Sequence, residues 1–318
     1  MSPFFSIVIP TYNHKNFLEV ALKCVFSQSL SDWEVIIVDN HSNDGTEDLV
    51  TSFNCTKLKY LKVHNEGVIG TSRNIGMQAA VGEWVCFLDS DDVWHPQKLE
   101  FIYDVIQKRP AIDVIVHDEL LVSDTNELKG KKLHYGPIFN QNYKYLLLNG
   151  NKLSTSATSI RRQFLINTSL TFSEKQKLVT VEDYDFWLKI AANGANFYFL
   201  HKILGYYLSH SSNNSKREKL HNQNQKNLLR YHTYEIQTFE PDKNKLWKNL
   251  MLIFDLKIAL RSFEMKRPVH SLKSILGSFL TAPMFLTKFL ANRIKDKALN
   301  KILFSYYSIL SIFDNQFK

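Results

Sequence analysis

The chain has 318 residues, of which 44% are hydrophobic and 22% charged, and it contains only 11 Gly and 8 Pro. These proportions exclude a disordered chain and a collagen-like repeat, and the length allows one large domain with an appendage or two domains. Three scattered cysteines are too few for a disulfide framework or a zinc site, which predicts a reducing compartment. Because the first ten residues carry no signal-peptide pattern, we expect a cytoplasmic protein.

Positive charge is concentrated toward the C-terminus. Residues 241–318 hold 14 Lys and Arg against 5 Asp and Glu, whereas residues 1–240 hold 25 against 26. A nucleic-acid-binding protein would be basic over its main body, so the near-neutral first 240 residues argue against that class. The apolar segments 271–291 and 302–313 are too interrupted or too short to span a membrane. They predict either helices that lie on an anionic membrane surface or an ordinary helical subdomain.

Up to about residue 118, short apolar runs alternate with segments of helical periodicity. The predicted strands cover residues 5–10, 34–38, 58–63, 84–88 and 114–117. The predicted helices cover residues 16–28, 46–53, 70–80 and 96–109, the last with Pro96 at its first position. This alternation predicts βαβ units and a mostly parallel sheet flanked by helices. Ligands of such sheets bind beyond the carboxyl ends of the strands.

Polar residues follow three of the predicted strands. Residues 10–13 follow the first strand, residues 39–46 the second and residues 89–92 the fourth. Any one of these segments could be a helix cap or a turn, and residues 42–45 are typical of a turn. Because all three lie at the same edge of the sheet, together they predict a binding site there.

Asp89 and Asp91 are two residues apart at the end of a strand, so in an extended chain their side chains point to the same side. Two neighbouring carboxylates stay ionised only with a cation or strong donors nearby. A hard divalent cation, Mg²⁺ or Mn²⁺, would keep coordination positions open for substrate phosphates. The alternative is a solvated acidic turn that precedes the next helix.

Residues 65–76 form a glycine-containing turn that enters a helix, but they match neither a Rossmann fingerprint nor a P-loop. Arg73, in the first turn of that helix, is placed either to reach a diphosphate or to form an ion pair on the helix surface. A further helix is predicted over residues 182–193, with Glu182 and Asp183 in its first turn, where the helix dipole favours acids. A carboxylate there can also act as a general base if it reaches a reacting hydroxyl.

Taken together, these segments resemble the family 2 glycosyltransferases, which are inverting, sugar-nucleotide-dependent enzymes of the GT-A fold. The matching segments are residues 6–13, 38–46, 65–76, 82–92 and 182–187, in the family's order over roughly the first 210 residues. The resemblance implies a GT-A domain over residues 1–215. Residues 216–318 would form a helical, basic extension used for membrane docking or for oligomer contacts.

The resemblance also implies a role for each matching residue. The residues implied to hold the nucleotide-sugar donor are Pro10, Thr11, Tyr12, Asp39, Gly67, Arg73, Asp89 and Ser90. Asp39 would accept the ring N–H of the base, and Asp91 with Asp89 would bind the Mn²⁺ or Mg²⁺ ion that bridges the diphosphate. Asp183 would be the general base that deprotonates the acceptor hydroxyl. His210 would be a phosphate or metal contact or a structural residue.

The leading hypothesis is therefore an enzyme that moves a hexosyl or N-acetylhexosaminyl group, with a uridine diphosphate donor favoured by the resemblance. The acceptor would be a glycan or a lipid-linked oligosaccharide in bacterial lipopolysaccharide or capsule synthesis, at the inner face of the cytoplasmic membrane. The alternative is a catalytically silent nucleotide-sugar-binding or scaffold subunit. That class predicts damaged acids, yet the four acids implied in binding and catalysis are all present. A nucleotidyltransferase would need a basic, glycine-rich loop after the first strand, which residues 10–13 do not supply.

Overall fold

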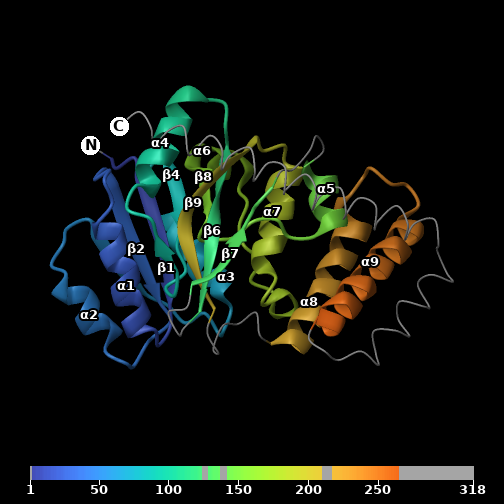
Figure 1. Ribbon diagram of the computed structural model, residues 1–318, viewed down its shortest axis with the longest axis horizontal. Coiled ribbons are helices and arrows are strands. Elements are labelled where there is room, and N and C mark those ends of the chain that lie inside the picture. Colours follow the sequence, from blue (N-terminus) through green and yellow to red (C-terminus); the bar gives the residue numbers. More distant parts are fainter. Residues whose placement is uncertain (1, 124–127, 137–141, 210–216, 265–318) are drawn as a thin grey trace. The chain divides into compact units, whose positions relative to one another are not determined.

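The computed structural model describes residues 2–123, 128–136, 142–209 and 217–264 (Figure 1). Its centre is a nine-stranded sheet in the order β3-β2-β1-β4-β8-β6-β9-β5, with β7 paired to β6. Six strands run in one direction: β1 (Phe5–Thr11), β2 (Trp33–Asp39), β3 (Leu58–Lys62), β4 (Trp84–Phe87), β6 (Val114–Ser123) and β9 (Phe197–Ser209). The strands that run the other way are β5 (Val93–Trp94), β7 (Leu128–Leu133) and β8 (Thr158–Arg161). The predicted mostly parallel α/β fold is confirmed.

Helices flank this sheet as the alternating sequence pattern predicts. They are α1 (Lys15–Phe26), α2 (Thr46–Ser52), α3 (Ile69–Ala79), α4 (Lys98–Lys108), α5 (Asn142–Asn149), α6 (Arg162–Thr168), η1 (Gln176–Leu178) and α7 (Glu182–Ala192). The helix α8 (Glu218–Tyr231) follows β9 in the chain. The predicted helix start at Pro96 is wrong. The N–H of Lys98 closes a turn on the carbonyl of His95, so Pro96 lies inside that turn and α4 begins two residues later.

The core lies on both faces of the sheet because successive residues of a strand point to opposite sides. Ile7 and Ile9 of β1 are fully buried in a cluster with the apolar faces of α1 and α4. Val8, between them, packs against α3, where a side chain at Gly76 would overlap it. Gly76 therefore lets α3 lie directly on β1, and this close packing brings Arg73 near the carboxyl ends of the strands.

Strand β8 accounts for the main difference from a purely parallel sheet. It lies between β4 and β6 and pairs antiparallel with both, and its sequence shows no strong period. The segment that leads into β8 runs past the end of β4 and delivers Ser154, Thr155 and Ser156 to the edge where the polar turns collect.

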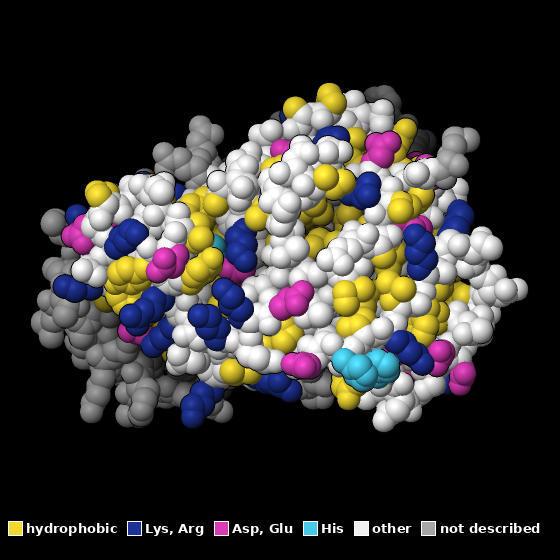
Figure 2. All heavy atoms as spheres, turned by 180° about the vertical axis from the view of Figure 1, so that it is seen from behind, with side chains coloured by type: hydrophobic (Ala, Val, Ile, Leu, Met, Phe, Trp, Pro, Cys, Tyr) yellow, Lys and Arg dark blue, Asp and Glu magenta, His cyan; other side chains and the backbone are white. Residues whose placement is uncertain are grey.

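The chain divides into two compact units, residues 1–228 and 229–318. The described part of the second unit contains the π-helical segment η3 (His232–Ile236) and the helix α9 (Lys243–Glu264). No helix within the described ranges is long and apolar enough to cross a membrane. The predicted surface helices at 271–291 and 302–313 lie outside the described residues, as does His210. On the face shown in Figure 2, Asp and Glu side chains lie among the Lys and Arg side chains.

Candidate active site

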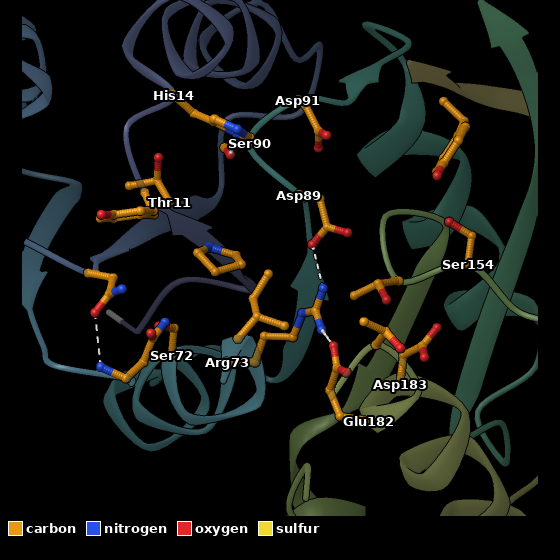
Figure 3. A pocket seen from close by; sticks show the side chains of 18 of the residues that line it. Thr11, His14, Ser72, Arg73, Asp89, Ser90, Asp91, Ser154, Glu182 and Asp183 are labelled. Carbon is orange, nitrogen blue, oxygen red and sulfur yellow. Dashed lines mark hydrogen bonds and ion pairs between the residues drawn. The ribbon is translucent and has the colours of Figure 1, made fainter. Parts of the chain in front are cut away.

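A cavity of about 710 Å³ opens at the carboxyl ends of β1 and β4 (Figure 3). Nine of the ten predicted site residues line it: Pro10, Thr11, Tyr12, Gly67, Arg73, Asp89, Ser90, Asp91 and Asp183. The structure thus brings together residues that are up to 173 positions apart in the chain. All lining residues belong to the first unit.

The first wall of the cavity comes from the ends of β1 and β2. Thr11 is buried, whereas Tyr12 is 55% exposed although its ring is large, so the ring presents a flat surface at the cavity. Asp39 is the one predicted residue that does not line the cavity. It is fully buried and accepts hydrogen bonds from the backbone N–H and hydroxyl of Ser42 and from the hydroxyl of Tyr60. In this structure Asp39 therefore fixes the loop after β2.

The turn before α3 also lines the first wall of the cavity. Asn65 accepts the N–H of Gly67 at 2.9 Å through its side-chain oxygen and donates to Ser72 at 2.9 Å. Gly67 has a φ of +77°, a left-handed conformation that glycine adopts without strain. This geometry explains the Asn-Glu-Gly sequence that the resemblance singled out.

Hydrogen bonds from neighbouring segments hold the acidic turn after β4 in place. Ser156 accepts the N–H of Asp89 at 3.0 Å and donates its hydroxyl to Asp92 at 2.6 Å, so it bridges both ends of the turn. Asp92 also accepts the N–H of Leu208 in β9. The buried Lys98 donates to the carbonyl of Ser156 at 2.8 Å, and burial lowers the pKa of this lysine to about 7. The segment before β8, the strand β9 and the helix α4 thus position the turn that carries the acids facing the cavity.

Arg73 lies between two carboxylates (Figure 3). Its guanidinium contacts Asp89 Oδ1 at 2.8 Å and Glu182 Oε1 at 3.0 Å, and only 4% of its side chain is exposed. Burial alone would lower the pKa of Arg73, but the negative charges of Asp89 and Glu182 outweigh burial and raise it. Both terminal nitrogens are engaged in buried ion pairs, so Arg73 does not form the ion pair on the helix surface that was the alternative, and it also lines the cavity. It connects the end of β4 to the start of α7.

Asp183 occupies the opposite wall, in the first turn of α7. Its carboxylate accepts the side-chain N–H of Asn151 at 3.1 Å and the N–H of Tyr184 at 2.7 Å. Desolvation raises the pKa of Asp183, and the negative charge of Asp89 adds to this, whereas Arg73 opposes it. A carboxyl group with a raised pKa takes up a proton more readily, as a general base must.

Asp89 and Asp91 provide a donor set that fits a divalent cation. Asp89 gives one oxygen to Arg73 and keeps the other, and Asp91 also faces the cavity. Desolvation raises the pKa of the buried Asp92, and the negative charges of Asp91, Glu119 and Asp89 raise it further, so the local potential is negative. Mg²⁺-type ions typically bind one or two carboxylates together with substrate phosphates, and these two carboxylates meet that requirement.

Most of the lining residues on the side of Asp183 were not predicted from the sequence. They are Leu133, Tyr135, Leu153, Ser154, Thr155, Thr180, Tyr207 and Arg217. They come from the end of β7 and the residues after it, the segment before β8, the end of β9 and the residues just before α7 and α8, and most of their positions depend on long-range pairing. The aromatic composition of β9 was the one available signal, because aromatic residues are enriched in strands.

Comparison with known proteins decides the family. The model of glycosyl transferase family 2 matches residues 6–170, about half of the chain. The chain belongs to glycosyl transferase family 2. The resemblance read from the sequence is therefore confirmed at the level of the family.

Individual relatives of this family 2 chain carry the name of glycosyltransferases as well. An uncharacterized glycosyltransferase of Nostoc sp. is 32% identical over 225 residues, which cover 66% of both chains. A putative teichuronic acid biosynthesis glycosyltransferase, TuaG of Bacillus subtilis, is 33% identical over 128 residues, 40% of this chain and 51% of TuaG. A fragment of S. aureus TarS in complex with UDP-GlcNAc superposes with a TM-score of 0.64 at 20% identity, covering 86% of this chain and 79% of the fragment. That likeness shows the fold, which is GT-A.

The chain spans only part of several curated relatives. The alignments with three long Rickettsia glycosyltransferases cover 36%, 36% and 32% of those proteins.

Proposed function

We propose that this protein is an inverting, metal-dependent glycosyltransferase that moves a sugar from a uridine diphosphate donor to a hydroxyl group of a glycan or lipid-linked acceptor. The observation that carries the proposal is that a single cavity holds the strand-end residues Thr11 and Tyr12, the acids Asp89 and Asp91, and Asp183. The TarS complex with UDP-GlcNAc supports the donor class, and the likeness to TuaG supports a role in cell-surface polysaccharide synthesis.

The donor would lie along the first wall. Tyr12 offers an exposed ring for stacking against the base, and Thr11 and Gly67 line the space beside it. Asp89 and Asp91 would hold Mn²⁺ or Mg²⁺, which as a Lewis acid offsets negative charge on a departing diphosphate. Arg73 fixes the position of Asp89 through their 2.8 Å ion pair.

The acceptor would enter on the side of Asp183. As the acceptor oxygen forms a bond to the anomeric carbon, its proton passes to the Asp183 carboxylate. The bond between the anomeric carbon and the phosphate oxygen breaks, and the diphosphate leaves with the electron pair. Attack from the face opposite the leaving group inverts the configuration. Asn151, by donating to one carboxylate oxygen of Asp183, orients the base for this transfer.

The substitution Asp183→Asn tests the proposal. Since a positioned general base contributes roughly 10²- to 10⁴-fold to rate, release of UDP from a panel of UDP-sugars with glycoside acceptors should fall by that factor. Thermal stabilisation by UDP with Mn²⁺ should be unchanged. The wild-type rate should decline with falling pH at a higher pH than an ordinary aspartate would give, because the pKa of Asp183 is raised.

Asp104→Asn, on an exposed part of α4 outside the cavity, is the matched control and should keep full activity. Near-normal transfer by Asp183→Asn would reject the general-base role. If wild-type protein binds UDP but transfers no sugar to any acceptor or to water, the silent-subunit hypothesis gains support instead.

The basic C-terminal region supports a second part of the proposal, that the enzyme works as a peripheral protein at an anionic membrane surface. Each Lys or Arg near such a surface contributes about 1 kcal/mol of attraction. Removal of residues 268–318 should therefore weaken co-sedimentation with anionic vesicles, while the weak binding to neutral vesicles should change little. Undiminished sedimentation of the shortened protein with anionic vesicles would reject this role. Stabilisation of the shortened protein by UDP would show that the first unit is intact.

A further inference from the structure

Three side chains from separate elements meet outside the acidic turn of the cavity. Asp118 in β6 contacts His134 Nδ1 at 2.8 Å and His201 Nδ1 at 3.4 Å, in both cases through its Oδ2. The possible ligand atoms of the three residues all lie within 4.8 Å of one another. We propose that Asp118, His134 and His201 form a second metal site, selective for Zn²⁺ or a similar imidazole-binding divalent ion.

The spacing of the ligand atoms suits such an ion. Zn²⁺ binds imidazole nitrogen and carboxylate oxygen at about 2.0–2.2 Å, so tetrahedral ligands lie about 3.3 Å apart. The distance of 3.4 Å between Asp118 and His201 is close to this value, and His134 would move outward by about half an ångström, while the ligand nitrogens of the two histidines lie within 4.8 Å of each other. Two imidazoles and one carboxylate leave the fourth coordination position of a tetrahedral ion open. The side chains of His134 and His201 are partly exposed, at 32% and 21% respectively.

The charge balance also favours a cation here. The Asp118 side chain is only 4% exposed, and among the described residues no Lys or Arg lies within ion-pair distance of it. Buried carboxylates are usually paired with a cation or bound to a metal, because an isolated buried charge is costly. Neutral imidazoles would supply hydrogen bonds but no charge, whereas a divalent ion bound by them supplies the charge.

The backbone is shaped to bring the ligands together. The register between β6 and β9 shifts at this point, so that His117 pairs with Leu200 but Asp118 pairs with Ile203. His201 is one of the two extra residues in this bulge, and bulges of this kind re-aim side chains next to functional sites. Gly136, two residues after His134, lies so close to the ring of Phe199 in β9 that a side chain would overlap it.

The site adjoins the wall on the side of Asp183. Leu133 and Tyr135, on either side of His134, both line the cavity. Asp118 accepts the N–H of Tyr135 at 3.0 Å through its second oxygen, an outer contact that fixes the orientation of the carboxylate. A metal ion would therefore hold this wall to β6 and β9. The expectation that the chain lacks zinc rested on its cysteines alone, and this site uses none.

The test measures metal content and requires no acceptor. Untagged full-length protein, dialysed after exposure to Zn²⁺, should retain about one equivalent by mass spectrometry, and Co²⁺ should give the visible absorption of a four-coordinate ion. His201→Gln and Asp118→Asn should lose both signals. His41→Gln and His64→Gln are matched controls, because their rings form another histidine pair, stacked at 3.7 Å, and they should keep the ion.

Two further measurements keep the proposal falsifiable. Asp91→Asn should also retain Zn²⁺, which separates this site from the proposed donor-metal site, so failure of either proposal can be recognised alone. Chelation of the wild-type protein should lower its Tm and added Zn²⁺ should restore it, without any variant having to fold. Chelated wild-type protein that binds no stoichiometric Zn²⁺, or a His201→Gln protein that retains it, would overturn the proposal.

Discussion

The two walls of the cavity are built in different ways. On the donor wall, several of the contacts that shape the turns are local: Ser42 donates to Asp39 three residues away, and Gly67 donates to Asn65 two residues away, although Tyr60 also donates to Asp39. On the opposite wall they join distant segments, since Arg73 reaches Glu182 and Asn74 holds the backbone of Phe172. A locally built wall depends on turn chemistry, whereas a wall built from distant segments depends on a few buried contacts. We therefore expect single substitutions to cost more where distant segments meet.

The largest effect is expected for Arg73→Met, which removes the link between the two walls. Loss of one partner of a buried ion pair leaves an uncompensated charge and typically costs about 3–5 kcal/mol in unfolding free energy. Glu182, whose side chain is 7% exposed, would carry most of this cost. Because desolvation already raises the pKa of Glu182, protonation at acidic pH would relieve the charge, and the loss should be greatest at alkaline pH. Urea unfolding at several pH values measures both effects.

The matched control for Arg73→Met is Lys23→Met. It also breaks an ion pair, that of Lys23 with Glu19, but both side chains are exposed, at 66% and 41%. Exposed pairs contribute about 0–1 kcal/mol, so this variant should unfold almost as the wild type does. Equal losses for the two variants would show that the link between the walls is not the sensitive point.

The next effect is expected in ligand binding, for Asp91→Asn. A ligand at 100 times its dissociation constant stabilises a protein by about 2.7 kcal/mol. We expect Mn²⁺ to increase the stabilisation of the wild type by UDP, and this increase to disappear in Asp91→Asn and in wild-type protein treated with a chelator. The measurement is the Tm with UDP, with and without Mn²⁺. Asp48→Asn, an exposed acid in α2, should behave as the wild type. A full Mn²⁺ response from Asp91→Asn would remove Asp91 from the site.

The same contrast explains how much could be predicted from the sequence. The donor wall follows strands whose apolar runs are short and clear, and its turns carry Asn, Asp and Gly at positions that only a few conformations tolerate. The sequence therefore predicted β1 to β4, the helices between them and the polar residues at the strand ends. The boundaries differ from the structure by one or two residues, as helix ends generally do.

On the other wall only α7 with Glu182 and Asp183 was predicted, because the strands of this wall are defined by their partners. The four residues of β8 take their place between β4 and β6 only in the folded sheet, and β7 joins the sheet through β6 alone. The role of Arg73 shows the same limit. Its position near the site followed from its helix, but its partner Glu182 lies 109 residues away, and no local pattern connects the two. His201 faces Asp118 only because β9 bulges.

The smallest effect, and the sharpest test of the local wall, is expected for Gly67→Ala. The φ of Gly67 is +77° and nothing lies within 4 Å of an added side chain, so the cost comes from the backbone alone, about 1–2 kcal/mol. Gly194, just after α7 and outside the cavity, has a φ of +78° and equally open surroundings. Gly194→Ala should therefore cost the same in urea unfolding, but only Gly67→Ala should weaken the stabilisation by UDP. If both variants bind UDP equally well, the turn at residues 65–67 does not contribute to the donor wall, and the first wall is confined to the ends of β1 and β2.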